Sequence, residues 1–192
     1  MIETLEPKWV KCFRDFFELS GVKPGDLIGV LAESQSRQIL LELTDHALYQ
    51  IGARSLRVTV PSPRLADPMP VRSTGATYAY DAYPEIMGSL GSCSLVVDCT
   101  VEGLLHSKAR QELLSAGGRV LMISNEHPEV LERCSVTREL HEFALESLSL
   151  LDNSSLMEVK SEAGTDLKIN TVGAPSRGGG GILGPVSYTH LT

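Results

Sequence analysis

The sequence predicts an α/β domain built on a mostly parallel sheet. Two observations carry this prediction: short apolar runs typical of buried strands recur along the chain, and segments with helical spacing of apolar residues separate them. A third observation limits how far this α/β pattern extends along the chain: the last two strand-like runs follow each other closely, as in a hairpin. Alternating strands and helices place helices on both faces of a sheet, as in Rossmann-like and flavodoxin-like folds.

The N-terminal part of the chain begins with an amphipathic helix. Trp9, Phe13 and Phe17 recur at helical spacing between residues 4 and 20, and Gly21 stands where a glycine commonly ends a helix. The run DLIGVLAE then contains the first predicted strand. That strand covers residues 27–31 and is followed by a helix at 36–51, a strand at 55–60, a Pro- and Ser-rich loop at 61–76 and a short helix at 85–90.

The C-terminal part continues the alternation and then departs from it. The third strand is expected in SLVVDCT, and a helix over LLHSKARQELLSAG precedes the fourth strand in RVLMIS. Helices over HPEVLERC and TRELHEFALESLSLL come next. LMEVKS and DLKINTV are then typical of two strands joined by the turn EAGT. We therefore predict an α/β domain at residues 1–152 and the beginning of a second domain at 153–184.

The composition fits one globular domain or slightly more and excludes several classes of partner. The chain has 192 residues, of which 42% are hydrophobic, and a net charge of −7. This acidic balance, with no basic cluster and few aromatic residues, argues against nucleic-acid binding. No apolar run approaches a membrane span, and the N-terminus lacks the layout of a signal peptide. The four cysteines form no CxxC pair, so we expect a cytoplasmic protein with free thiols.

A ligand site is expected where the parallel strands end, because ligands of open α/β sheets bind beyond the carboxyl ends of the strands. The first strand is not followed by GxGxxG or GxxxxGK[ST], the usual glycine-rich phosphate loops. The four glycines at 178–181 follow no strand and precede no helix, so we interpret them as a flexible segment. The histidines and carboxylates show no spacing typical of metal ligands, and no metal site is predicted within this chain.

The best-placed polar residues follow the third strand. Asp98 ends that strand, and Glu102 and His106 come in the loop and at the expected start of the next helix. A histidine at a helix N-terminus lies near the positive end of the helix dipole, which favours the neutral imidazole that can accept a proton. His106 is therefore the candidate catalytic residue, and a capping or solvated histidine is the alternative. His46, His127 and His141 are weaker candidates.

Two stretches carry a resemblance to a known family. LVVDCTVEGLLHSKARQELLSAGGRVLMISNEHPEVLERC and MEVKSEAGTDLKINT together resemble the N-terminal part of 2,5-dihydroxypyridine 5,6-dioxygenases and the related T-type metallo-aminopeptidases. The resemblance implies a cytoplasmic Fe(II) enzyme of nicotinate degradation that uses O2 to open an aromatic ring and forms a homo-oligomer. A Leu-His pair near the substrate matches Leu105 and His106 here, which makes Leu105 a candidate substrate-binding residue and His106 a candidate acid or base.

The resemblance leaves alternatives open. In both groups the metal ligands lie in a larger C-terminal part, so this chain is expected to be an N-terminal fragment that is inactive alone. An aminopeptidase would use Zn or Co in place of iron. The third hypothesis is a protein of another class, a non-catalytic α/β module that binds a small anion or nucleotide. The missing phosphate loop counts against this hypothesis.

The C-terminal segment PVSYTHLT, residues 185–192, is predicted to be foreign to the domain. Its codons can be written so that they contain a transposon-end adapter of the kind used in sequencing libraries. A segment of that origin is set aside from the fold, as any processing or fusion remnant would be. The alternative is a native mobile terminus.

Overall fold

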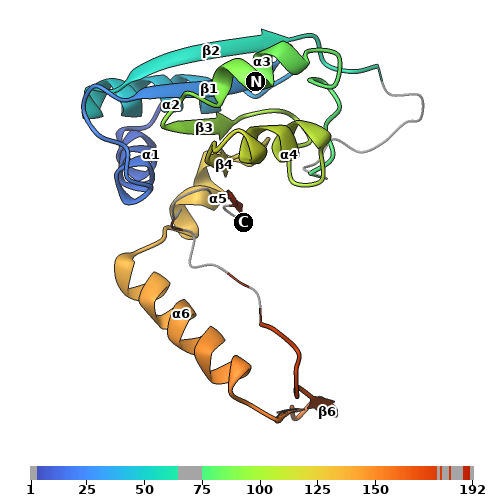
Figure 1. Cartoon of the computed structure of the whole chain (residues 1–192). Helices are drawn as coiled ribbons and strands as arrows, with labels where there is room; N and C mark the ends of the chain where they lie inside the picture. The colour runs from blue at the N-terminus through green and yellow to red at the C-terminus, as the bar shows by residue number, and fades with distance from the viewer. Residues whose placement is uncertain (1–3, 65–74, 177, 179–181, 183–187, 191–192) are drawn as a thin grey trace. The chain divides into compact units, whose positions relative to one another are not determined.

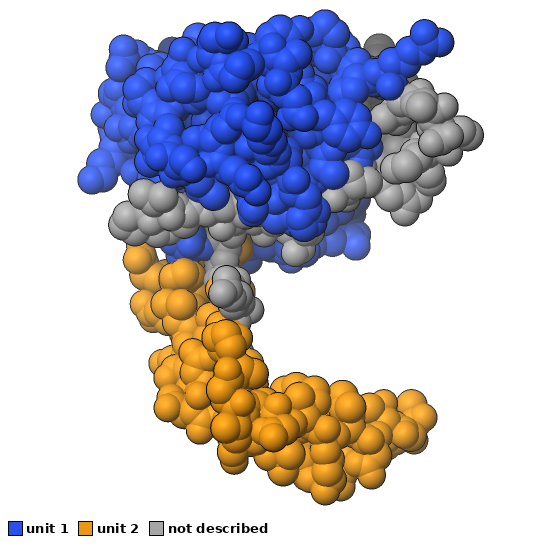
Figure 2. Space-filling view, turned by 45° about the vertical axis from the view of Figure 1, so that its right-hand side comes forward, with its two compact units in different colours: residues 1–135, 182–192 blue, residues 136–181 orange. Residues whose placement is uncertain are grey.

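A computed structural model describes residues 4–64, 75–176, 178, 182 and 188–190 of the chain. It divides into two compact units, Met1–Ser135 with Ile182–Thr192 and Val136–Gly181 (Figure 2). Each unit is described here by itself. The glycine run predicted to be flexible lies outside the described residues, apart from Gly178.

The first unit is built on a parallel sheet whose strand order is β2-β1-β3-β4-β7 (Figure 1). Its strands are β1 (Leu27–Glu33), β2 (Arg54–Val60), β3 (Leu95–Asp98), β4 (Val120–Met122) and β7 (Tyr188–His190). The chain passes from β1 to β2 on one side and then to β3 on the other, so the order reverses between β1 and β3. The predicted fold class is confirmed, and the order of the first four strands is the flavodoxin-like one.

Helices cover both faces of this sheet because each strand alternates its side chains between two apolar layers. On one face α1 (Pro7–Leu19) packs against α2 (Gln38–Ile51) and α5 (Pro128–Arg133). On the other face α3 (Pro84–Leu90) packs against α4 (Lys108–Ser115). The β1 and β3 strands are buried between these layers, which is the environment expected for the central strands of a doubly wound sheet.

Neighbouring residues of β4 belong to different faces of the core. Val120 packs in the cluster that contains Leu90 of α3 and Leu113 of α4. Leu121 instead lies with Phe17 of α1. All of these side chains are almost fully buried, and each stabilises the fold by about 1.5–3 kcal/mol through removal of apolar surface from water.

The predicted helix over residues 104–117 is too long at its N-terminus. The helix α4 begins at Lys108, with Ser107 as N-cap, and the residues before it form a turn. The hydroxyl of Ser107 accepts from the Arg110 backbone N–H, as an N-cap serine does. The turn has tertiary hydrogen bonds of its own, described below, and these prevail over the helical pattern of the sequence.

The second unit contains α6 (Arg138–Asp152) and the antiparallel hairpin β5 (Leu156–Lys160) and β6 (Asp166–Asn170). The sequence predicted both the helix and the hairpin. None of the residues of α6 is buried, and Phe143 and Leu150 are 67% and 75% exposed. The boundary between the units follows Ser135, whereas the predicted domain boundary follows residue 152. Compact units are not independent folding domains, so the domain division stays a prediction.

The segment predicted to be foreign contributes the short strand β7. Its three residues pair in parallel with β4, with Tyr188 beside Val120 and His190 beside Met122. The other residues of 185–192 lie outside the described part of the chain. The origin of the segment stays a prediction, and its pairing provides a way to test it.

Deletion of residues 185–192 is expected to leave the thermal stability of the protein unchanged, because an adapter-derived segment has not been selected to stabilise this sheet. Differential scanning calorimetry of the full and shortened chains measures this. A clear fall in melting temperature on deletion would mean that the β7 pairing is a native part of the sheet.

Candidate functional site

The loop that follows β3 is organised around the carboxylate of Asp98, which is completely buried. One oxygen of Asp98 accepts from the Thr100 backbone N–H at 3.0 Å and from the Thr100 hydroxyl at 2.6 Å. The other oxygen accepts from the Leu104 backbone N–H at 2.7 Å. The Thr100 hydroxyl oxygen in turn accepts from the Gly103 backbone N–H at 3.1 Å. The loop from Cys99 to Leu104 is thereby folded back onto the end of its own strand.

The loop also packs closely against β4. Gly103 has a positive φ of 80°, and a Cβ at this position would lie 2.6 Å from the Met122 Sδ atom. Ser124 is completely buried and has a φ of 58°, which is unusual for a residue with a side chain. Its backbone N–H donates to the Asp98 carbonyl oxygen, and its hydroxyl donates to the Val101 carbonyl oxygen. The strained serine therefore joins the end of β4 to the start and the middle of the loop.

A second segment, Gly75–Thr77, pairs with the same loop from the side of β1. Gly75 donates its backbone N–H to the Glu102 carbonyl and accepts from the His106 N–H, and Thr77 donates its N–H to Gly103 at 2.9 Å. The Thr77 hydroxyl donates to a carboxylate oxygen of Glu33 at 2.7 Å. Glu33 ends β1 and is only 3% exposed. The segment thus connects the ends of two neighbouring parallel strands.

Two buried carboxylates therefore lie at the carboxyl edge of the sheet, where the strand order reverses between β1 and β3. Burial raises the pKa of Asp98 to about 6, the three donors oppose that shift, and the negative charge of Glu33 adds to it. Burial also raises the pKa of the neighbouring Cys99 thiol to about 12, which keeps this thiol protonated and unreactive at neutral pH.

Tyr80 ties β1 and β2 together near the same edge. Its hydroxyl is within 2.7 Å of the Ala32 carbonyl oxygen and 2.8 Å of the Val58 carbonyl oxygen, and it accepts from the Ala32 N–H at 3.0 Å. The side chain is 1% exposed, and burial raises its pKa above the ordinary value. This hydroxyl is a structural bridge rather than an acid or base.

The two residues singled out by sequence lie in the turn just before α4. Leu105 is half-buried, and a Cβ at Gly75 would lie 2.6 Å from the Leu105 Cβ, so this approach requires glycine. His106 is exposed and directly precedes the N-cap Ser107, so it lies in the turn before α4 and not at the start of the helix, where the sequence predicted it. The structure thus brings Asp98, Glu102 and His106 into one loop. Their roles stay predictions.

The other candidate groups are dispersed. His127 is the N-cap of α5 and accepts from Glu129, whereas His46 lies on α2 and His141 on α6. All four cysteines are free thiols, as predicted. Within the described ranges no three His, Cys, Asp or Glu residues gather in a way that could hold a metal ion. Those residues therefore do not fit an iron site of their own. The helices described also include none long and apolar enough to span a bilayer.

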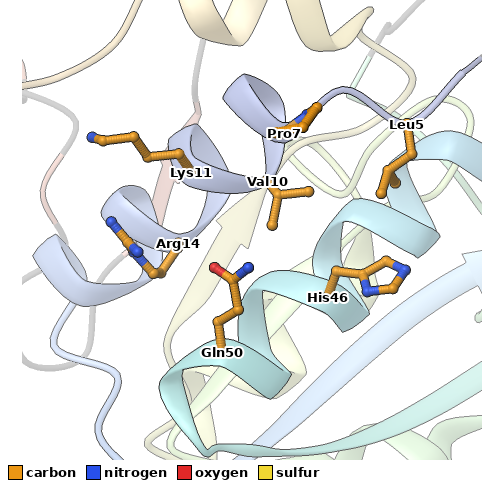
Figure 3. A pocket seen from close by; sticks show the side chains of 7 residues that line it. All are labelled: Leu5, Pro7, Val10, Lys11, Arg14, His46 and Gln50. Carbon is orange, nitrogen blue, oxygen red and sulfur yellow. The ribbon is translucent and has the colours of Figure 1, made fainter.

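A pocket of about 490 Å³ lies away from the sheet edge, between α1, the residues before it and α2 (Figure 3). Val10 and Gln50 point toward one another across it, and Lys11 and Arg14 extend along one side. Both cations pair with Asp15, in the case of Arg14 at 3.0 Å. Arg14 also lies 4.0 Å from Glu18, so each cation at the pocket has a carboxylate partner, which does not favour the interpretation of the chain as an anion-binding module.

Sequence reasoning singled out Asp98 but missed the other polar residues that shape the site, Thr77, Tyr80, Thr100 and Ser124. The order Asp98-x-Thr100-x-x-Gly103 is a usable signal, because an aspartate accepting from residues two and more positions ahead makes a local turn. Thr77 and Tyr80 gave no such signal. They reach the strand ends from a distant segment, and only the tertiary fold places them there.

Comparison with known proteins identifies a family and a solved structure that match most of the chain. The family model NicX, 2,5-dihydroxypyridine 5,6-dioxygenase, matches residues 8–185. The solved 2,5-dihydroxypyridine dioxygenase of Pseudomonas putida is similar over 95% of this chain and 53% of its own, with 25% sequence identity and a TM-score of 0.75. A mutant coronafacic acid ligase of Pectobacterium brasiliense matches 62% of this chain and 19% of its own, with 15% identity and a TM-score of 0.36. None of the curated proteins matches significantly.

The coverage of these matches is unequal. This chain spans about half the length of the Pseudomonas putida dioxygenase, although nearly all of this chain is matched. The likeness to the coronafacic acid ligase is too low in TM-score to carry an argument.

The Tyr80→Phe substitution is expected to lower the free energy of unfolding by about 1–3 kcal/mol, because it leaves the buried Ala32 N–H without its acceptor. Urea denaturation measures the change. Tyr78→Phe is the matched control, since Tyr78 is 59% exposed and its hydroxyl should be dispensable. Equal effects of the two substitutions would show that the Tyr80 bridge does not stabilise the strands.

Asp98 is expected to make stability fall as pH rises from about 4 to about 6. Its folded pKa of about 6 exceeds the ordinary 3.8, so the folded state retains a proton that the unfolded state has released. The resulting loss in the free energy of unfolding is on the order of 2–3 kcal/mol, and it is complete above pH 6. Denaturation curves of the wild type and Asp98→Asn across this range isolate it, because asparagine does not titrate. A stability difference between the two that stays constant with pH would contradict the raised pKa.

Proposed function

The chain belongs to the 2,5-dihydroxypyridine 5,6-dioxygenase family, and from that premise we propose that it forms the N-terminal part of an enzyme that opens the ring of 2,5-dihydroxypyridine with O2. The observation that carries the proposal is the family match, which runs through nearly the whole chain. The similar fold of the Pseudomonas putida dioxygenase supports it. Because this chain spans about half of that enzyme, the activity is proposed for a longer protein that contains it.

We propose that the carboxyl edge of the sheet contributes substrate-contacting groups to that enzyme. The turn before α4 presents the half-buried Leu105 beside the exposed His106. An apolar side chain next to an imidazole suits a small aromatic substrate with hydroxyl groups, since one can contact the ring and the other can exchange a proton with a hydroxyl. His106 is the proposed acid or base, and Leu105 is the proposed ring contact.

Iron enters the proposal as the cofactor of the complete enzyme. Fe(II) would supply the activation of O2 that protein side chains cannot provide. The residues described here hold no ligand set for it, so the roles proposed for this chain are confined to its protein groups. We further propose that the enzyme degrades a nicotinate-derived aromatic compound, assembles as a homo-oligomer and works in the cytoplasm. The free thiols of all four cysteines support a reducing compartment.

The purified chain alone is expected to bind Fe(II) no more tightly than about micromolar and to consume no O2 with 2,5-dihydroxypyridine, because strong iron binding needs several side chains converging on one position. Elemental analysis and an oxygen electrode measure these two properties. Stoichiometric, tightly held metal would contradict the proposal that the ligands lie elsewhere.

His106 is expected to matter for catalysis and not for folding. In a chimera in which residues 1–171 replace the matching part of the Pseudomonas putida dioxygenase, His106→Ala should lower kcat by roughly 10²–10⁴-fold, the usual contribution of a general acid or base. The iron content should stay unchanged, and the pH–rate profile should lose a limb near neutrality. His46→Ala, which removes another exposed histidine, is the control.

The outcomes of the chimera experiment separate the proposed roles. If kcat of the His106→Ala chimera stays within threefold of that of the unsubstituted chimera, His106 is only a solvated or capping residue and not an acid or base.

A further inference from the structure

We propose that Asp98 is a positioning residue for the reaction, whose buried carboxylate fixes the turn that carries Leu105 and His106. The inference rests on the proposed function, since it assigns to that turn a substrate-contacting role. It concerns a side chain that is itself inaccessible, because Asp98 is completely buried and its carboxylate faces the loop rather than solvent. Asp98 therefore acts through the loop and not on substrate.

The first step of the argument is the number and placement of the donors that meet the Asp98 carboxylate. Three donors occupy its two oxygens, and they come from both ends of the segment between Thr100 and Leu104. Leu104 directly precedes the Leu105–His106 pair. A carboxylate can accept all of these bonds at once, whereas an amide has a single acceptor oxygen. Asparagine at this position would therefore release one end of the loop.

The second step is that the loop is held on its other sides as well. The Thr100 hydroxyl, which donates to the Asp98 carboxylate, accepts from the Gly103 N–H. Ser124 donates to the carbonyl oxygens of both Asp98 and Val101. The Ser124 φ of 58° is a strained conformation, which persists when surrounding contacts fix it. The polar contacts centred on Asp98 form one connected group that joins β3, the loop and the end of β4.

The third step connects this group to the residue proposed to act. The His106 backbone N–H donates to the Gly75 carbonyl, and the Thr77 N–H donates to the Gly103 carbonyl. These bonds form only if the loop backbone has the shape that Asp98 imposes. Because a displacement of about 1 Å can reduce catalysis by about 100-fold, a loop anchored by a buried carboxylate is a means of positioning His106.

The first test uses the chain as it exists and needs no activity. Amide hydrogen exchange, followed by NMR, reports on the His106 and Thr77 amides, neither of which contacts Asp98 directly. We expect exchange of both amides to become at least about tenfold faster in Asp98→Asn and in Thr100→Val, and to stay near the wild-type rate in Thr100→Ser, which keeps the hydroxyl. Phe17→Leu is the control, because it weakens the core on α1 without touching the loop.

The exchange result can contradict the proposal in two ways. Unchanged exchange at His106 in Asp98→Asn would show that the loop keeps its shape without the carboxylate. Equal acceleration in Phe17→Leu would show that the effect is a loss of global stability rather than of loop geometry.

The second test uses the chimera described above. Asp98→Asn should lower kcat by roughly 10–100-fold with KM changed less than threefold, since the misplaced group acts in the transition state. The double variant Asp98→Asn/His106→Ala should be no slower than His106→Ala alone, because both changes remove one function. If the two substitutions lowered kcat independently, so that their effects multiplied in the double variant, the positioning role of Asp98 would be overturned. An inactive chimera would count against the proposed function, whereas the exchange measurements would still decide whether Asp98 fixes the turn.

Discussion

The Asp98 carboxylate at the end of β3 is the constraint on which the rest of the site depends. Its three hydrogen bonds, from Thr100 and Leu104, fold the following loop back onto the end of the strand. Burying a carboxylate is costly unless its hydrogen bonds are satisfied, and here each oxygen has at least one donor. The cost is reflected in the raised pKa of about 6, which shows that the donors offset burial only in part.

The position of this carboxylate follows from the topology of the sheet. Asp98 is aligned with Leu31 of β1, at the point where the chain order reverses between β1 and β3. At such a point the loops of neighbouring strands turn away from each other, and the space that opens between them is where α/β proteins bind ligands. Here Gly75–Thr77 and the loop after β3 meet at this space and are joined through Glu33 and Thr77. The fold thus provides the location, and polar residues that are not needed for the sheet itself provide the shape.

The sequence was sufficient for the elements and insufficient for the site, for separate physical reasons. Continuous apolar runs and period-3.6 patterns reflect burial, so strands such as Leu27–Glu33 and helices such as Gln38–Ile51 could be predicted with errors of a few residues. The same pattern extended the predicted helix at 104–117 too far, because Leu104 and Leu105 are apolar for tertiary reasons: Leu104 lies in the core, and Leu105 packs on Gly75. The Thr77–Glu33 bond joins residues 44 positions apart and leaves no local trace in the sequence.

The second unit shows the opposite relation between sequence and structure. Its helix α6 and hairpin were predicted correctly from local pattern, yet many of their apolar residues remain exposed, including Phe143, Leu150 and Leu156. A helix and a two-stranded hairpin cannot bury enough apolar surface to be stable on their own, and exposed apolar patches of this kind mark surfaces that are covered in a larger assembly or a longer chain. Local pattern therefore specifies the elements of this unit, whereas its stability depends on contacts that the unit cannot supply. The Asp98 loop differs because its hydrogen bonds to Thr100, Leu104, Gly75, Thr77 and Ser124 lie within the first unit.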